Sequence, residues 1–253
     1  MGVSSNSIIH FTDSLDAIKG IIKNSFKLKY CREYIYIGDD SYVDILVPMV
    51  SFCDIPLSEI KEHIDKYGSY GVGLTKEWAR KNHLNPVLYI DKNSFLNKTL
   101  GSAVESYIIS KHQGKNPLHA LPIEDRPVID ILRYVKNYQE DLKRKEETIP
   151  DYRFYDEREW RYVPDVNEDI GFCFDRDKLE GFEDVYADSQ EKLSDLKLSF
   201  SPEDISYIII NDDSEIHEIL RFLKETMGGE FSYKSIERLS TRILTVAQIK
   251  GDF

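Results

Sequence analysis

The chain has 253 residues, of which 41% are hydrophobic and 31% charged, so it can bury a core and is not disordered as a whole. Its formal net charge of −12 argues against a protein that holds duplex DNA or RNA mainly through the phosphates, because such binding needs a basic face. No apolar run approaches the roughly 20 residues that cross a bilayer, the N-terminus lacks a signal-peptide pattern, and the three cysteines are widely spaced. We therefore expect a cytoplasmic protein with no membrane association and no broad nucleic-acid binding.

The first part of the sequence predicts strands that alternate with helices. A short apolar strand ends near Phe11, and Thr12 or Asp13 can cap the helix that follows. A glycine at position 68 suits the end of a short helix that begins near Leu57. Beyond it the pattern predicts a strand from Tyr70 to Leu74, a helix from Thr75 to about Asn82 and a strand over residues 87–90.

The rest of the sequence predicts a helical segment and then more strands. Residues 97–147 look mainly helical and end in the charge run "EDLKRKEET", which is typical of a solvated helix end. Later elements are a strand over 154–164, an acidic loop-rich stretch over 177–200, a buried strand over 204–211 and a helix over 213–229. Since there are no internal repeats and no low-complexity linker, we expect one α+β domain spanning residues 1–253, with a helical insertion at 97–147.

Several common catalytic motifs are absent from the sequence. There is no phosphate-binding loop of the Walker type, no dinucleotide fingerprint, no His-Glu-x-x-His and no Gly-x-Ser-x-Gly. Nicotinamide dehydrogenases, P-loop NTPases, zinc proteases and esterases are thereby disfavoured. No carboxylate cluster has the spacing of metal ligands, so we expect no metal, and a nuclease is a weaker interpretation.

Three isolated polar residues in strand contexts are the candidates for chemistry. His10 ends the first strand, although a histidine there can also be a boundary residue with one satisfied ring nitrogen. Tyr70 lies between glycines, which let other atoms approach the backbone but can also serve turn geometry alone. Glu159 shares a strand face with Glu157 and Arg161, where either an exposed ion pair at a sheet edge or a carboxylate in a pocket fits the pattern.

The order of these residues resembles the His-Tyr-Glu arrangement of ADP-ribosyltransferases. "YGVGLTKEWARK" is similar to the segment of those enzymes in which Gly and Tyr precede a small hydroxyl residue and a helix, and "EREW" is similar to their Glu-x-Glu strand. The resemblance implies a split β-sheet fold, NAD as co-substrate, and a cleft that His10, Tyr70 and Glu159 line together. It also implies the following roles: ribose holding by His10, ring stacking by Tyr70, charge stabilisation by Glu159, further cofactor contacts from Thr12, Gly71 and Thr75, and support from Trp78.

These residue types suit the chemistry that the resemblance implies. Cleavage between nicotinamide and ribose develops positive charge on the sugar, as in glycoside hydrolysis. A nearby carboxylate can stabilise that charge, a histidine can hydrogen-bond a ribose oxygen, and a tyrosine can stack on the nicotinamide ring.

A second resemblance covers more of the chain. The blocks at residues 8–31, 47–90 and 154–164 together resemble the AbiGi family of abortive-infection proteins. This resemblance implies bacterial phage defence and the antitoxin half of a toxin–antitoxin pair, encoded beside a toxin or other defence partner. Two hypotheses stay open at this point: an NAD-consuming transferase that modifies a macromolecule, and a non-catalytic antitoxin that binds and neutralises its partner, for which an acidic charge is suitable.

Overall fold

The chain forms two compact units, each built from segments that are distant in sequence. In this computed structural model the described residues are 5–38, 41–112, 117–144, 147–166, 169–229 and 231–252. Unit 1 comprises residues 1–27, 51–85 and 197–253, and unit 2 comprises residues 28–50 and 86–196. Both units mix helices and strands, so the α+β class is confirmed, while a single domain over the whole chain and its likeness to the transferase fold stay predictions.

Unit 1 contains a mainly antiparallel sheet. Its strands run in the order β15, β14, β5, β1 and the last residues of β4. β14 and β15 are parallel, whereas β5 is antiparallel to both β14 and β1. The bounds are β1 (Ser7–Thr12), β4 (Ser41–Cys53), β5 (Tyr70–Thr75), β14 (Ile205–Ile210) and β15 (Ile243–Thr245), with a separate short pair of β2 (Phe26–Lys27) and β13 (Lys197–Leu198).

Within its described residues, unit 1 also contains helices. They are α1 (Leu15–Asn24), α2 (Lys61–Tyr67), α3 (Lys76–Lys81), α7 (Ile216–Met227), α8 (Tyr233–Ser240) and α9 (Val246–Asp252). The cap of α1 is Ser14, whose hydroxyl accepts from the Ala17 N–H, and not Thr12, which still belongs to β1. Gly68 does end α2, as predicted, with a φ of 117° that disfavours other residues.

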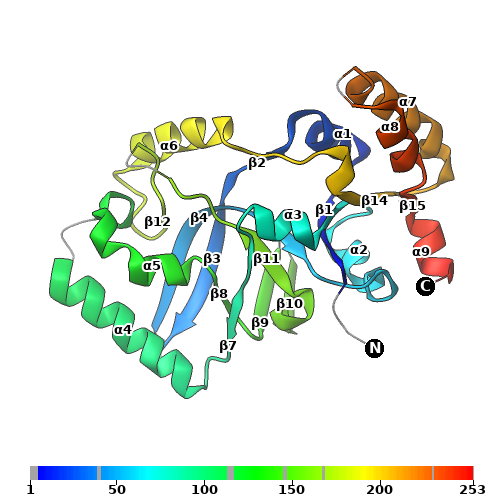
Figure 1. Ribbon diagram of the computed structural model, residues 1–253. Coiled ribbons are helices and arrows are strands. Elements are labelled where there is room, and N and C mark those ends of the chain that lie inside the picture. The colour runs from blue at the N-terminus through cyan, green and yellow to red at the C-terminus, as the bar shows by residue number, and fades with distance from the viewer. Residues whose placement is uncertain are drawn as a thin grey trace. The chain divides into compact units, whose positions relative to one another are not determined.

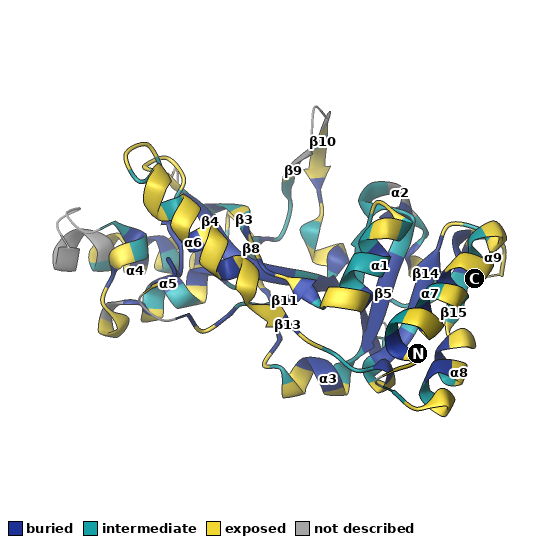
Figure 2. Ribbon diagram, turned by 90° about the horizontal axis from the view of Figure 1, so that it is seen from above, coloured by how far each residue is buried: buried dark blue, intermediate teal, exposed yellow. Residues whose placement is uncertain are grey.

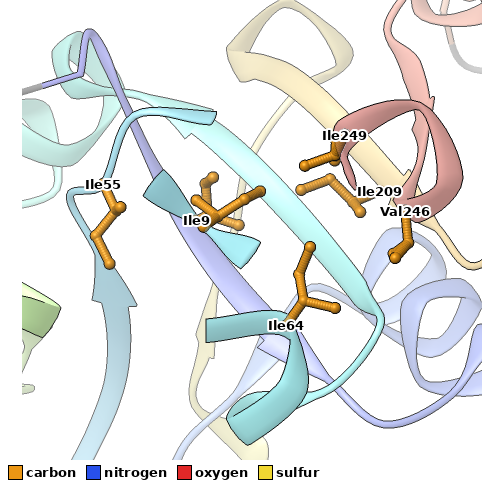
Figure 3. Packing of buried hydrophobic residues seen from close by; sticks show 7 residues of the cluster. Ile9, Ile55, Ile64, Ile209, Val246 and Ile249 are labelled. Atoms are coloured by element: carbon orange, nitrogen blue, oxygen red, sulfur yellow. The ribbon is translucent and has the colours of Figure 1, made fainter. Parts of the chain in front are cut away.

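An aliphatic core covers one face of the unit 1 sheet. Ile9 of β1 and Ile209 of β14 point to the same side, where side chains from α2 and α9 meet them (Figure 3). The buried members are Ile9, Ile55, Ile60, Ile64, Ile209, Val246 and Ile249. Because side chains alternate along a strand, His10 and its neighbours of even number in β1 lie on the opposite face of the sheet.

Unit 2 is organised around a long antiparallel hairpin of β3 (Lys29–Ile37) and β4 (Figure 1). β12 (Phe174–Asp175) pairs with β4, and β7 (Leu88–Ile90) pairs in parallel with β8 (Val135–Asn137). The Asn137 side-chain amide donates to the Tyr34 carbonyl and accepts from the Tyr36 N–H, which fastens β8 beside β3. Unit 2 also contains α4 (Phe95–His112), α5 (Pro127–Leu132), α6 (Glu183–Asp195) and β11 (Glu159–Tyr162). The two-residue strand β6 (Asn85–Pro86) has one residue in each unit.

The predicted helical insertion at 97–147 is correct only in its first part. Its described residues up to Leu132 contain α4, two 3-10 turns (Leu118–Ala120 and Ile123–Asp125) and α5. The charge run instead forms a hairpin of β9 (Glu140–Arg144) and β10 (Glu147–Tyr152). In this hairpin Leu142 lies opposite Ile149, and such a cross-strand apolar pair favours pairing over a solvated helix.

The acidic stretch over 177–200 is also more regular than predicted. It contains α6, which buries Ser189 and Leu193 and leaves its outer face exposed (Figure 2). Among the described residues, no helix has both the length and the apolar character needed to cross a membrane.

Candidate functional site

In unit 1, three of the predicted site residues share one sheet face. In the pairing of β1 with β5, His10 is opposite Val72 and Thr12 is opposite Tyr70. Directly opposed residues of an antiparallel pair project to the same side, and residues two apart in a strand do so as well. His10, Thr12 and Tyr70 therefore lie on the same face of two neighbouring strands.

The imidazole of His10 makes a hydrogen bond to the backbone and contacts aromatic rings. Its Nδ1 lies 2.8 Å from the carbonyl oxygen of Ser51, which can only accept, so Nδ1 carries the hydrogen. Phe26 and Phe52 contact the imidazole edge-on, with centroid distances of 5.2 and 5.7 Å. This arrangement agrees with the alternative of a boundary histidine, and a role in holding ribose stays a prediction.

Tyr70 is anchored through its hydroxyl. The Tyr70 O–H donates to Oε1 of Glu215 over 2.7 Å, and the other oxygen of Glu215 accepts from the Asn211 N–H. Burial and the bond to the Glu215 carboxylate raise the pKa of Tyr70 to about 12, so the hydroxyl stays protonated. The hydrogen bond fixes the ring at the end of β5.

Gly71, Thr75 and Trp78 have structural roles. Gly71 lies on the opposite face, where an added Cβ would be 3.2 Å from Cγ2 of Ile9. The Thr75 hydroxyl caps α3 by accepting from the Trp78 N–H over 3.1 Å. Trp78 is buried and donates its indole N–H to the Ser199 carbonyl over 2.9 Å. Packing and capping are sufficient reasons for these residue types, and cofactor binding by them stays a prediction.

In unit 2, Glu159 is buried in an ion cluster. Strand β11 starts at Glu159, because Phe154–Glu157 form a 3-10 turn and Arg158 has a left-handed φ of 46°. Oε1 of Glu159 accepts from Nε of Arg161, and Oε2 accepts from Nζ of Lys136, each over 2.6 Å. Of the two alternatives for this strand, the exposed ion pair is thus wrong: the exposed fraction is 4% for the Glu159 side chain and 0% for Arg161.

The cluster contains three carboxylates and two cations. Arg161 also donates from Nη2 to Glu33 of β3 over 2.6 Å and from Nη1 to the Arg133 carbonyl over 2.9 Å. Lys136 of β8 reaches Glu157 over 3.2 Å in addition to Glu159. Arg161 therefore joins acids from two different strands, β11 and β3, whereas Lys136 joins two acids that are two residues apart in the chain.

The electrostatics of the cluster favour a charged Glu159. Burial alone would raise its pKa, but the charges and hydrogen bonds of Arg161 and Lys136 hold the pKa of Glu159 well below its usual range. Burial would lower the pKa of Lys136, yet the neighbouring carboxylates raise it well above normal. For Glu33, burial outweighs the attraction of Arg161 and raises the pKa of this carboxyl, which is the surplus acid.

The predicted residues are distributed over both units. His10, Thr12 and Tyr70 come together in unit 1, whereas Glu159 belongs to unit 2, and a single cleft lined by His10, Tyr70 and Glu159 stays a prediction. Sequence reasoning named Arg161 only as a neighbour and missed Lys136 and Glu33. No pattern in the sequence links these two to Glu159, because they lie 23 residues and more than 100 residues away.

Comparison with known proteins agrees with the sequence resemblance. Residues 24–211 match the family model of the abortive phage resistance protein AbiGi, which is described as an antitoxin. The chain is 28% identical over 226 residues to the abortive phage resistance protein AbiGi of Lactococcus lactis subsp. cremoris, a match that covers 82% of this chain and 89% of that relative. No solved structure is significantly similar. The chain belongs to the AbiGi family of abortive phage resistance proteins.

Proposed function

We propose that this protein is the antitoxin of a phage-defence toxin–antitoxin pair and that it acts by binding its partner, without catalysis. The observation that carries the proposal is the state of Glu159, the carboxylate predicted for catalysis. One of its oxygens accepts a hydrogen bond from the fully buried Arg161, and the other accepts one from the half-buried Lys136.

A catalytic carboxylate of a transferase must face the developing charge on ribose. To do so, Glu159 would have to leave Arg161 and Lys136, which would then keep only Glu33 and Glu157 as counter-charges among the described residues. Removing one partner from a buried ion pair costs about 3–5 kcal/mol. The arrangement is therefore better suited to holding β11, β8 and β3 together than to contacting a substrate.

The distribution of charge also supports a binding role. Unit 2 contains 28 Asp and Glu against 18 Lys and Arg, a net charge of −10 out of the −12 of the whole chain. Charge complementarity speeds association and selects partners, so this unit suits a partner with a basic surface.

The second candidate function is that of an NAD-dependent ADP-ribosyltransferase acting on a macromolecular target. It is favoured by His10, Thr12 and Tyr70 lying on one face of paired strands, in the order that the transferases have. It requires a carboxylate that is available to ribose, for which Glu159 remains the candidate.

The two functions are separated by testing neutralisation and NAD turnover. If a toxin is encoded beside this protein, as the family resemblance implies, co-expression of the two should restore growth. The purified pair should release no nicotinamide from NAD above the level of a folded Glu159→Gln variant. Tyr70→Phe and His10→Gln should neutralise as well as the unmodified protein. The transferase function would be supported, and the antitoxin function rejected, by two results together. The unmodified protein would release nicotinamide, and Glu159→Gln would abolish both this release and the protection from the toxin.

A further inference from the structure

The hairpin of β3 and β4 in unit 2 has one face that is aromatic and solvent-exposed near its turn. The register pairs Tyr34 with Asp44 and Tyr36 with Tyr42, so these four side chains project to the same side. The opposite side carries Ile35, which is buried. We call Tyr34, Tyr36 and Tyr42 the tyrosine face.

The three rings form one continuous surface. Tyr34 and Tyr42 stack with centroids 4.6 Å apart and an interplanar angle of 23°, and Tyr36 meets Tyr34 edge-on at 5.3 Å. Tyr42 is 48% exposed, and Tyr34 and Tyr36 are half-buried. Exposing apolar ring surface to water is unfavourable. A group of exposed aromatic side chains therefore indicates an interaction site.

Charged groups surround the tyrosine face in a fixed arrangement. Asp44 is buried and accepts from Arg32 over 2.6 Å and from Arg176 over 3.5 Å, so its charge is compensated within the protein. Next to Tyr42 lies Asp177, whose negative charge is the main cause of the raised pKa of the Tyr42 hydroxyl. The Arg32 guanidinium is 6.0 Å from the centroid of the Tyr34 ring, and Nζ of Lys92 is 5.5 Å from the centroid of the Tyr36 ring, so this aromatic surface already holds two cations of the protein itself at its edges.

The acidic surplus of unit 2 is concentrated in the segment that includes Asp177. Residues 165–195 contain eleven Asp and Glu against three Lys and Arg, and α6 within them exposes most of its acidic side chains. β12, in the same segment, pairs with β4 and thereby joins this acidic surface to the hairpin.

We propose that the tyrosine face is the surface by which unit 2 binds an arginine- and lysine-rich segment of a partner protein. The inference rests on the proposed antitoxin function and specifies its partner. Tyr and Arg are the residue types that dominate binding energy at protein interfaces, and cations stack favourably on tyrosine rings. Asp177 beside Tyr42 and the acidic segment 165–195 supply the complementary charge. The net charge of −10 on unit 2 opposes binding of a nucleic acid, whose bases also stack on aromatic rings.

The test measures binding of a fluorescently labelled deca-arginine peptide to the full chain by anisotropy, with deca-glutamate and oligothymidylate as the other probes. Tyr42→Ala should weaken deca-arginine binding roughly tenfold, because a desolvated cation–π contact has that magnitude. Tyr42→Phe should bind normally, since it keeps the ring. The matched control is Tyr155→Ala, which removes a tyrosine of the same unit with an exposed fraction of 47% and should have no effect.

Three results would overturn the proposal. The first is equal affinity of Tyr42→Ala and the unmodified chain for deca-arginine. The second is a loss of affinity in Tyr155→Ala as large as that in Tyr42→Ala. The third is binding of oligothymidylate, and not of deca-arginine, that Tyr42→Ala weakens. Circular dichroism of each variant verifies folding, and Tyr34→Ala provides a second removal from the stacked pair. If Tyr42→Ala still neutralises the toxin and binds the peptide normally, the surface is wrong but the antitoxin function stands; if the unmodified chain does not neutralise, the function itself fails.

Discussion

Replacing Arg161 by Met tests whether the buried ion cluster stabilises unit 2. Arg161 is fully buried and joins Glu159 and Glu33, each over 2.6 Å. Methionine fills a similar volume but removes the charge, which leaves Lys136 as the remaining cation of the cluster. Because removal of one partner from a buried pair costs about 3–5 kcal/mol, we expect the free energy of unfolding to fall by that amount.

The measurement is urea denaturation at neutral pH followed by tryptophan fluorescence, to which Trp160 on the same strand contributes. The control is Arg153→Met in the same unit. Arg153 and Asp156 are 3.9 Å apart and more than half exposed, and such pairs contribute about 0–1 kcal/mol. If Arg161→Met loses no more stability than Arg153→Met, the cluster is not a stabilising element and the argument against a catalytic Glu159 loses its energetic basis.

Three further substitutions have defined outcomes. Burial raises the pKa of Glu33 in the folded protein above its unfolded value of about 4.3. The contribution of Glu33 to the free energy of unfolding is therefore complete below the unfolded pKa, and it is lost as the pH rises through the folded pKa. Urea titrations from about pH 4 to 7 should show the unmodified chain losing stability relative to Glu33→Gln, and an opposite trend would contradict this sign. Gly68→Ala should be more destabilising than Gly181→Ala in thermal melts, because only at Gly68 does the new methyl group meet the Thr12 carbonyl; equal losses would argue against the steric cause. Tyr70→Phe should lower the free energy of unfolding by about 1 kcal/mol, measured calorimetrically, since it removes the bond to Glu215, and an unchanged value would mean that this bond is not stabilising.

Local patterns in the sequence were sufficient for much of unit 1. The apolar run ending at Phe11, the glycine after α2 and the segment from Tyr70 through the Thr75 cap carry their signals within a few residues, and the structure confirms those elements. Capping and strand alternation act between near neighbours, so a single sequence contains the information.

The predictions that were wrong depend on distant contacts. The charged residues at 140–147 are compatible with a helix end and with a strand. The pairing of Leu142 with Ile149 across the hairpin, which the local sequence does not show, favours the strand. The strand at Glu159 presents the same difficulty, because its partners Lys136 and Glu33 come from β8 and β3. Alternation alone gives the side on which Glu159 and Arg161 lie, but not whether that side faces water, a pocket or other charges.

The ion pair with Arg161 argues against a catalytic role for the second acid of the Glu-x-Glu pattern, on which the resemblance to transferases rests. In "EREW" the second acid is followed, two residues later on the same face, by the arginine that binds it. A carboxylate intended for a cationic transition state needs its negative charge available, whereas a neighbouring guanidinium 2.6 Å away neutralises that charge before any substrate arrives. Arg161→Met would release Glu159 only by destabilising the cluster, so a gain in NAD turnover in that variant would reveal a latent transferase site. Loss of stability with no turnover would instead mean that this acid stabilises the fold of unit 2.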